Sequence, residues 1–224
     1  MTPEAGPRPN AHAWGLIAVV GTGIVTIAAI LAATGVLPGE TVVRAIVRGA
    51  SDADMRWLAR RIRPLGTWWG IVPGVVLLLA VSRHARRRWW LWGLALVVAP
   101  LIGEALQELV GRLRPRGLAF GFPSGHATAV AAFAVATIYL TGRSGLPRAV
   151  RLLITLVATA AALAVGLSRM VLDAHWPLDV VAGFALGATG SAAAAWWDAS
   201  HPVDAPAVPT RERRRRARDP HPRS

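Results

Sequence analysis

Three short polar clusters interrupt an otherwise apolar chain, and each carries residue types that bind or transfer a phosphoryl group. The clusters are QELVGRLRPR at 107–116, PSGH at 123–126 and SRMVLDAHWPLD at 168–179. The guanidinium groups of Arg114 and Arg169 can fork onto phosphate oxygens. Ser124 and Gly125 precede a predicted helix, whose free N–H groups and positive dipole end suit an anion. We therefore expect these clusters to form one anion-binding site.

Two histidines and a carboxylate supply groups that can move protons or a phosphoryl group. His175 and Asp179 are four residues apart, so on a helix they would share a face. The carboxylate can then hold one imidazole nitrogen as a donor and leave the other free as a nucleophile. His126 is available to protonate a leaving group. Together with the anion site, these residues indicate phosphoryl transfer.

Other ionisable residues of the clusters have two readings each. Arg112 and Arg116 either contact phosphate or anchor a helix end by reaching towards water. Asp173 is expected to be a loop residue rather than a catalytic one. His126, His175 and Asp179 could in principle ligate a metal, but the neighbouring arginines would repel a cation. We therefore expect no metal ion and no cofactor.

The composition places these clusters in a membrane protein. Of 224 residues, 54% are hydrophobic and 17% are charged, with a mean hydropathy of +0.43, whereas soluble domains carry about 25% charged residues. The chain has no cysteine, which excludes thiol catalysis and thiolate metal sites. All 25 basic side chains are arginine, so Schiff-base chemistry and a Walker-type phosphate lysine are also excluded.

Hydropathy predicts an all-α, polytopic bundle of six transmembrane helices. The expected spans are 13–37, 65–82, 89–110, 127–141, 152–167 and 180–197. Because a span needs about 20 apolar residues, we expect loop residues to extend the shorter helices. The first span is too long and too weakly basic at its start for a cleaved signal peptide. The spacing of Val42, Val43, Ile46 and Val47 predicts a short amphipathic helix lying in the membrane interface.

Arginine placement predicts the orientation of this bundle. Arginines fill the loops at 83–88 and 143–151 and the segment 201–224, which span parity puts on one side, and positive residues mark the cytoplasmic side. The prediction is an N-terminal cytoplasmic tail at 1–12, a six-span domain at 13–200 and a disordered cytoplasmic tail at 201–224. The three polar clusters then lie on the extracytoplasmic side of a cell membrane. The loop at 38–64 opposes this orientation, because it also holds six arginines.

The tail arginines allow a different partner, nucleic acid. No aromatic residues interleave with them and no nucleic-acid-binding fold module is recognisable. We therefore expect anionic lipid headgroups, and not nucleic acid, as their partners.

Together, the three clusters resemble the type 2 phosphatidic acid phosphatase family of integral membrane lipid phosphatases. That family's pattern is a lysine, six residues and Arg-Pro; then Pro-Ser-Gly-His; then Ser-Arg, five residues, His, three residues and Asp. The matching residues here are Arg114-Pro115, 123–126, Ser168-Arg169, His175 and Asp179. Gln107 occupies the lysine position. An amide still donates a hydrogen bond but brings no charge.

The resemblance implies a metal-independent mechanism through a phosphohistidine. His175 attacks phosphorus, Asp179 orients it, and His126 protonates the leaving oxygen before water hydrolyses the intermediate. The residues expected to hold the phosphate are Arg114, Arg169, Ser124, the Gly125 amide and Gln107. The implied substrate is a lipid phosphate or diphosphate, such as a polyprenyl diphosphate (undecaprenyl diphosphate), phosphatidic acid or phosphatidylglycerol phosphate.

Two other functions fit parts of the pattern. A catalytically weakened lipid-binding or transport protein of the same fold would account for Gln107. The vanadium-dependent haloperoxidases have a similar anion pocket, but they are soluble, and six spans argue against that function. Gly183, Gly187 and Gly190 share one face of the last span and could pack closely against a neighbour, within the chain in preference to a second copy.

Overall fold

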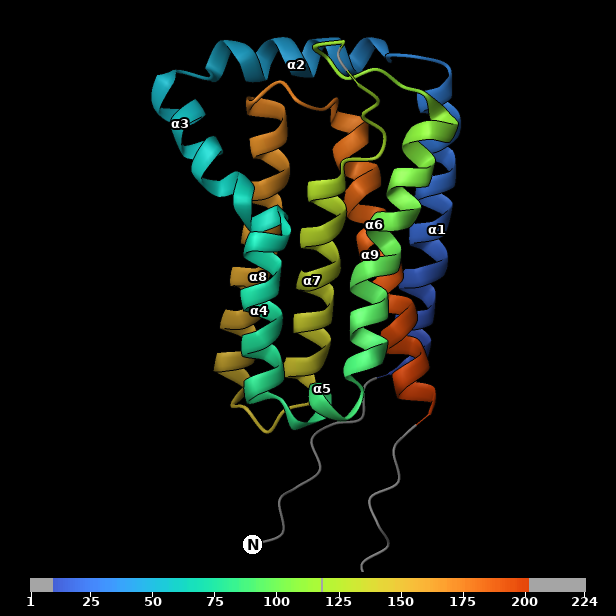
Figure 1. Cartoon of the computed structure of the whole chain (residues 1–224), viewed down its shortest axis with the longest axis vertical. Coiled ribbons are helices and arrows are strands. Elements are labelled where there is room, and N and C mark those ends of the chain that lie inside the picture. Colours follow the sequence, from blue (N-terminus) through green and yellow to red (C-terminus); the bar gives the residue numbers. More distant parts are fainter. Residues whose placement is uncertain (1–9, 118, 202–224) are drawn as a thin grey trace, which may run out of the picture.

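The structure, a computed structural model, describes residues 10–117 and 119–201 (Figure 1). The predicted tail at 201–224 lies outside these residues except for His201, and so does most of the predicted segment 1–12. Within the described residues the chain is helical, with no strand beyond one isolated bridge between Leu113 and Phe120. The elements are α1 (Ala11–Ala33), α2 (Pro38–Ala50), α3 (Ala53–Ile62), η1 (Arg63–Gly66), α4 (Trp68–Val81), α5 (Arg83–Arg87), α6 (Trp89–Val110), α7 (Gly125–Gly142), α8 (Arg148–Val171) and α9 (Pro177–Ser200).

Five of these helices, α1, α6, α7, α8 and α9, are long and apolar enough to cross a membrane. The sixth predicted span differs, because α4 has only 14 residues. It reaches spanning length only together with α3 and η1, from which it is bent by 52°. The prediction of an all-α membrane bundle is confirmed, and α7, α8 and α9 extend beyond the predicted spans as expected. Helix α8, for example, begins at Arg148 and not at residue 152.

The segment between the first two predicted spans forms two helices, and the residues of the predicted amphipathic helix lie in the first of them, α2. Helix α2 lies across one end of the bundle (Figure 1), and its Val42, Val43 and Ile46 side chains are exposed. Helix α2 is followed directly by α3. Asp52 is the N-cap of α3, and its side chain accepts a hydrogen bond from the Met55 N–H at 2.7 Å, which favours a helix start there. Arg44 ties α2 down through two hydrogen bonds to Asp173, at 2.7 and 2.8 Å.

Helix α9 lies against α1, α6 and α7, and small residues let these helices approach closely. A Cβ atom on Gly183 would lie 2.6 Å from the Ser124 carbonyl oxygen, and one on Gly187 would lie 2.8 Å from the Ala132 nitrogen. Gly190 faces Ala99 of α6. The predicted glycine face therefore packs inside the chain, against α7 and α6.

The other end of α9 is held by a buried carboxylate. Asp198, with 1% of its surface exposed, accepts a hydrogen bond from Tyr139 and lies 2.8 Å from His84 Nε2 and 3.0 Å from an Arg88 nitrogen. These contacts join α9 to α5, α7 and the residue before α6. Figure 1 places the start of α1, the end of α9 and α5 at one end, and α2 at the opposite end. The three polar clusters lie at the α2 end, as span parity predicts.

The close approach of α9 to α7 predicts the effect of one methyl group. Gly187→Ala places Cβ against the Thr128 carbonyl oxygen and the Ala132 nitrogen, and such overpacking typically costs about 1–3 kcal/mol. We expect a lower midpoint when the purified protein is unfolded with SDS and followed by tryptophan fluorescence. Gly23→Ala, on α1 with no atom within 4 Å of the new Cβ, is the control and should be neutral or slightly stabilising. Equal midpoints for both variants would contradict this packing.

Candidate functional site

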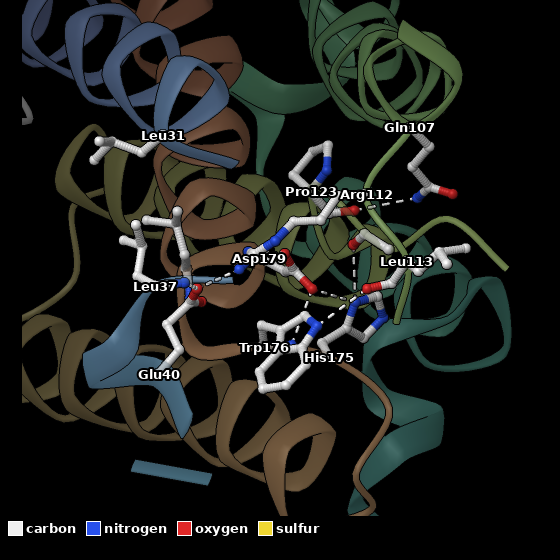
Figure 2. Close-up of polar contacts among 12 residues, drawn as sticks. Leu31, Leu37, Glu40, Gln107, Arg112, Leu113, Pro123, His175, Trp176 and Asp179 are labelled. Atoms are coloured by element: carbon white, nitrogen blue, oxygen red, sulfur yellow. Dashed lines mark hydrogen bonds and ion pairs between the residues drawn. The ribbon is translucent and has the colours of Figure 1, made fainter. Parts of the chain in front are cut away.

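The three polar clusters meet beneath α2, where the loop between α6 and α7 passes the start of α9 (Figure 2). His175 lies in the short segment between α8 and α9, and only 4% of its surface is exposed. Its Nδ1 atom is 2.9 Å from the carbonyl oxygen of Gly121 and 3.6 Å from Oδ2 of Asp179. The imidazole is therefore held by a carbonyl 54 residues away in the chain and by a carboxylate four residues away.

This geometry determines the protonation of His175. A carbonyl oxygen can only accept a hydrogen bond, so Nδ1 must carry the proton and Nε2 keeps its lone pair. Burial lowers the pKa of His175 from its ordinary value, and the Asp179 carboxylate opposes that shift without reversing it. His175 is consequently a neutral imidazole at pH 7, with Nε2 free to act as a nucleophile.

One expectation about this pair is wrong. His175 and Asp179 do not share a helix face, because α9 begins at Pro177 and His175 precedes it. Asp179 lies in the first turn, where its Oδ2 accepts the Trp176 N–H at 2.9 Å. Pro177 favours a helix start at this point. The four-residue spacing therefore brings the carboxylate back towards the imidazole through a capping turn, and the closer partner of Nδ1 is the Gly121 carbonyl.

A buried ion-pair chain holds Asp179 in place. Arg112 donates to Asp179 Oδ1 at 2.8 Å and forms a second ion pair with Glu40 of α2 (Figure 2). Glu40 also accepts the Leu178 N–H at 3.0 Å. Arg112 is 5% exposed, so it is neither an anchor reaching for water nor open to a phosphate. Sequence reasoning missed Glu40; its signal was a lone acidic residue at 38–51.

The Pro-Ser-Gly-His segment is fixed from both sides. Its Ser124 N–H donates to the backbone oxygen of Asp179 at 2.9 Å, and Gly125 begins α7. Gln107 donates from Nε2 to the Pro123 carbonyl oxygen at 3.1 Å. The residue at the family's lysine position thus contacts the loop that starts α7. The buried Ser124 hydroxyl has no hydrogen-bond partner among the described residues.

Arginines surround His126 at the start of α7. Arg114 donates from Nε to the Phe120 carbonyl oxygen at 2.9 Å, which aims its side chain along the loop. Arg169 is 6% exposed, and its Nε has no partner in the described part of the chain. The charges of Arg114, Arg169 and Arg63 all act on His126. The structure therefore brings together the predicted phosphate-binding arginines and adds Arg63, which sequence reasoning missed.

Gly121 is a third residue that sequence reasoning missed. A Cβ atom there would lie 2.8 Å from Arg114 Cγ, 3.2 Å from Asp179 Oδ2 and 3.5 Å from His175 Nδ1. The loop backbone can approach the imidazole only because this position has no side chain. The other predicted residues lie as follows: Asp173 in the loop after α8, paired with Arg44, and Arg116 exposed at the surface.

No group of three or more His, Cys, Asp or Glu side chains is placed to hold a metal ion within 10–117 and 119–201. The groups that face the site with positive charge are arginines, namely Arg63, Arg114 and Arg169. The chemistry of this donor set suits an anion.

The sequence is similar to a known family and to several curated phosphatases. The PAP2 superfamily sequence model matches residues 88–201. A decaprenylphosphoryl-5-phosphoribose phosphatase from Mycobacterium tuberculosis is 39% identical over 127 residues, covering 51% of this chain and 64% of that protein. An undecaprenyl-diphosphatase from Sulfolobus acidocaldarius is 29% identical over 125 residues, covering 50% of this chain and 56% of that protein. The matches therefore span less than two thirds of these curated relatives.

The fold has a counterpart among solved structures. A crystal structure of a transmembrane PAP2-type phosphatidylglycerolphosphate phosphatase from Bacillus subtilis superimposes with a TM-score of 0.71. It is 22% identical, and the superposition covers 81% of this chain and 97% of that one. The helical arrangement described above is therefore shared with a known membrane protein.

The contact between His175 and Gly121 predicts a tautomer. In protein carrying ¹⁵N-labelled histidine, the His175 ring should show a protonated Nδ1 and an unprotonated Nε2 at pH 7, because a carbonyl accepts from Nδ1. His175→Ala assigns the signal by removing it. As pH falls, the ring should gain its second proton only below about 6.5, the ordinary value. A doubly protonated ring at pH 7, or a proton on Nε2, would contradict the geometry.

Proposed function

This chain belongs to the PAP2 superfamily, and we propose that it is a membrane phosphatase that hydrolyses a lipid phosphate or diphosphate. The observation that carries the proposal is His175, a buried neutral imidazole whose free Nε2 lies beside an arginine-lined anion site. Helix packing does not explain the buried Arg169, because burying a cationic group whose Nε has no partner among the described residues is costly. The imidazole and the arginines together suit a reaction in which a phosphoryl group moves to nitrogen.

The proposed reaction has two displacements at phosphorus. In the first, Nε2 of His175 forms a bond to phosphorus while the bond between phosphorus and the lipid oxygen breaks. His126 gives its proton to the departing oxygen as general acid. In the second, water attacks the phosphohistidine, His126 accepts a proton from that water, and His175 is released with inorganic phosphate.

The neighbouring residues stabilise the charge that develops on the phosphoryl oxygens. Arg114 and Arg169 supply positive charge, and the Ser124 hydroxyl and Gly125 N–H supply neutral donors at the start of α7. Asp179 keeps the imidazole oriented and favours the positive charge that His175 gains on attack. Because arginines provide the electrostatic stabilisation, the proposed mechanism needs no metal ion.

The proposed substrate class follows from what the relatives' names share. Those names specify a decaprenylphosphoryl-5-phosphoribose, undecaprenyl diphosphate and a phosphatidylglycerol phosphate, and all three are lipids that carry a phosphate group. We propose that this chain acts on a polyprenyl diphosphate, phosphatidic acid or phosphatidylglycerol phosphate. The catalytic end would face the extracytoplasmic side of a cell membrane, with both termini cytoplasmic, because arginines fill the loops of the opposite end.

A second candidate function is supported by Gln107. An uncharged amide that contacts the Pro123 carbonyl brings no positive charge to phosphate. The chain would then bind or transport a lipid phosphate with little turnover. Phosphate release distinguishes the two functions.

Removal of the nucleophile is the direct test of catalysis. We expect purified protein in detergent with EDTA to release phosphate from at least one lipid of a panel of polyprenyl diphosphate, phosphatidic acid and phosphatidylglycerol phosphate. His175→Ala should lower this rate by about 10²–10⁴-fold or more. His12→Ala, at the exposed start of α1, is the matched control. Release that EDTA abolishes, or that His175→Ala leaves intact, would refute the mechanism.

A charge restored at position 107 tests its part in phosphate binding. Gln107→Lys should lower KM by about tenfold, equivalent to about 1.4 kcal/mol, with a smaller change in kcat. Gln107→Met, which removes the hydrogen bond to the Pro123 carbonyl and adds no charge, should lower kcat instead. If Gln107→Lys changes neither parameter, the side chain at 107 does not reach the substrate phosphate.

A further inference from the structure

A basic cavity lies next to the proposed catalytic residues, at the end of α8. Its volume is about 300 Å³, and its lining residues are Arg56, Arg60, Arg63, Arg116, Arg169, Leu172 and Ala174. Five of these seven side chains are arginines, and no acidic residue lines the cavity within the described residues. Like charges gathered at one place repel one another, and a bound anion would offset that repulsion. We call this cavity the arginine basin.

The arginines come from three separate segments. Arg56, Arg60 and Arg63 are spaced i, i+4 and i+7 along α3 and η1, so they lie on one face. Helix α3 and η1 both pack on α8, with Ala59 buried and the three arginines exposed. Close packing of η1 fixes the register, because a Cβ atom on Gly66 would lie 2.9 Å from the His126 carbonyl oxygen and 2.8 Å from a Val165 methyl carbon. The basin is therefore built by the fold and not by chance proximity of surface side chains.

The basin is continuous with the catalytic residues. Ala174, directly before His175, lines it, and so does Arg169. Arg169 as a whole residue is 6% exposed, and its Nε has no partner among the described residues. The charge of Arg63 acts on both Arg169 and His126. A group bound in the basin would therefore lie beside the phosphoryl group that His175 attacks.

Carboxylates near the basin do not neutralise it. Asp173, the acidic residue of the α8–α9 segment, is held by two hydrogen bonds from Arg44, and of the basin's arginines Arg116 also acts on it. Asp52 is used in capping α3. The exposed side chains of Arg56, Arg60 and Arg63 are thus available to a ligand with at least two negative charges.

We propose that the arginine basin binds a second phosphate group of the same substrate molecule, next to the phosphoryl group transferred to His175. This proposal rests on the proposed function and narrows its substrate class. The favoured substrates are lipids that carry a diphosphate, or a phosphomonoester together with a second phosphate close to it. Lipids with a single phosphate, such as phosphatidic acid, leave the basin unfilled.

Binding of two phosphonates tests the basin without requiring turnover. We would measure, by calorimetry on the full chain in zwitterionic detergent, the affinities of methylphosphonate and of methylenediphosphonate, which is not hydrolysed. The diphosphonate should bind at least tenfold more tightly. The double variant Arg56→Gln/Arg60→Gln should lower the affinity for the diphosphonate about tenfold, the order of one charge-assisted hydrogen bond. It should lower the affinity for methylphosphonate less than threefold.

Arg61→Gln is the matched control, because Arg61 lies on the same helix but stacks on Trp57, 5.2 Å from the ring centroid. It should change neither affinity by more than threefold. If the double variant weakens both phosphonates equally, or no more than Arg61→Gln does, the basin acts only as a diffuse positive field and the proposal fails.

A neighbouring anionic lipid is the alternative source of a phosphate. The measurement is therefore repeated in nanodiscs of phosphatidylcholine with and without phosphatidylglycerol. A preference for the diphosphonate that survives phosphatidylglycerol supports the proposal. A preference that phosphatidylglycerol removes in the wild type assigns the basin to a membrane lipid and overturns it.

Turnover separates this proposal from the proposed function. Where phosphate release is observed, the double variant should lower kcat/KM for polyprenyl diphosphate about tenfold and for polyprenyl monophosphate less than threefold. If the chain binds the diphosphonate more tightly but releases no phosphate from any lipid, the phosphatase function is refuted, while binding of two phosphate groups at the basin is still supported. If the chain releases phosphate but the double variant lowers kcat/KM equally for both substrates, the phosphatase function stands and the basin proposal fails.

Discussion

The buried ion-pair chain from Glu40 through Arg112 to Asp179 is the constraint on which the proposed catalytic end depends. Burying charged groups is expensive unless each one is paired and hydrogen-bonded. Here every member has several partners, since Asp179 also caps α9 and Glu40 also accepts the Leu178 N–H. The chain therefore joins α2, the loop after α6 and the first turn of α9 into one unit. The position of His175 follows, because it lies between that loop and that turn.

Helix α9 carries a buried aspartate near each end, and the two have different relations to the helix dipole. Asp179 lies in the first turn, where a negative charge is favourable. Asp198 lies near the last turn, where it is unfavourable, and its partners His84, Arg88 and Tyr139 compensate. Between the two, glycines bring α9 against α7 and α6. A helix held at both ends and packed tightly in the middle is a rigid support for the imidazole beside it.

The positive charge around the site comes partly from different positions than the family pattern predicts. The first cluster has Gln107 where the family pattern has a lysine, and that amide contacts the Pro123 carbonyl. The charge of Arg63, in η1, acts on His126 and Arg169. Arg63 belongs to the bent helix made of α3, η1 and α4, and this helix positions its charge near the site. The 52° bend places α3 at the catalytic end while α4 continues the bundle.

Much of this protein follows from local features of its sequence. Apolar runs of spanning length predict the bundle, span parity predicts that the three clusters meet at one end, and the spacing of Gly183 and Gly187 predicts a close helix contact. Each depends on hydropathy or periodicity over a few turns. Only the tertiary structure decided that Arg112 is buried between Glu40 and Asp179, that the Gly121 carbonyl holds His175, and that Arg63 faces His126. Those partners are 72, 67, 54 and 63 residues apart. Spacing within one element cannot reveal them, because a buried charge finds its partner only when packing brings distant segments together.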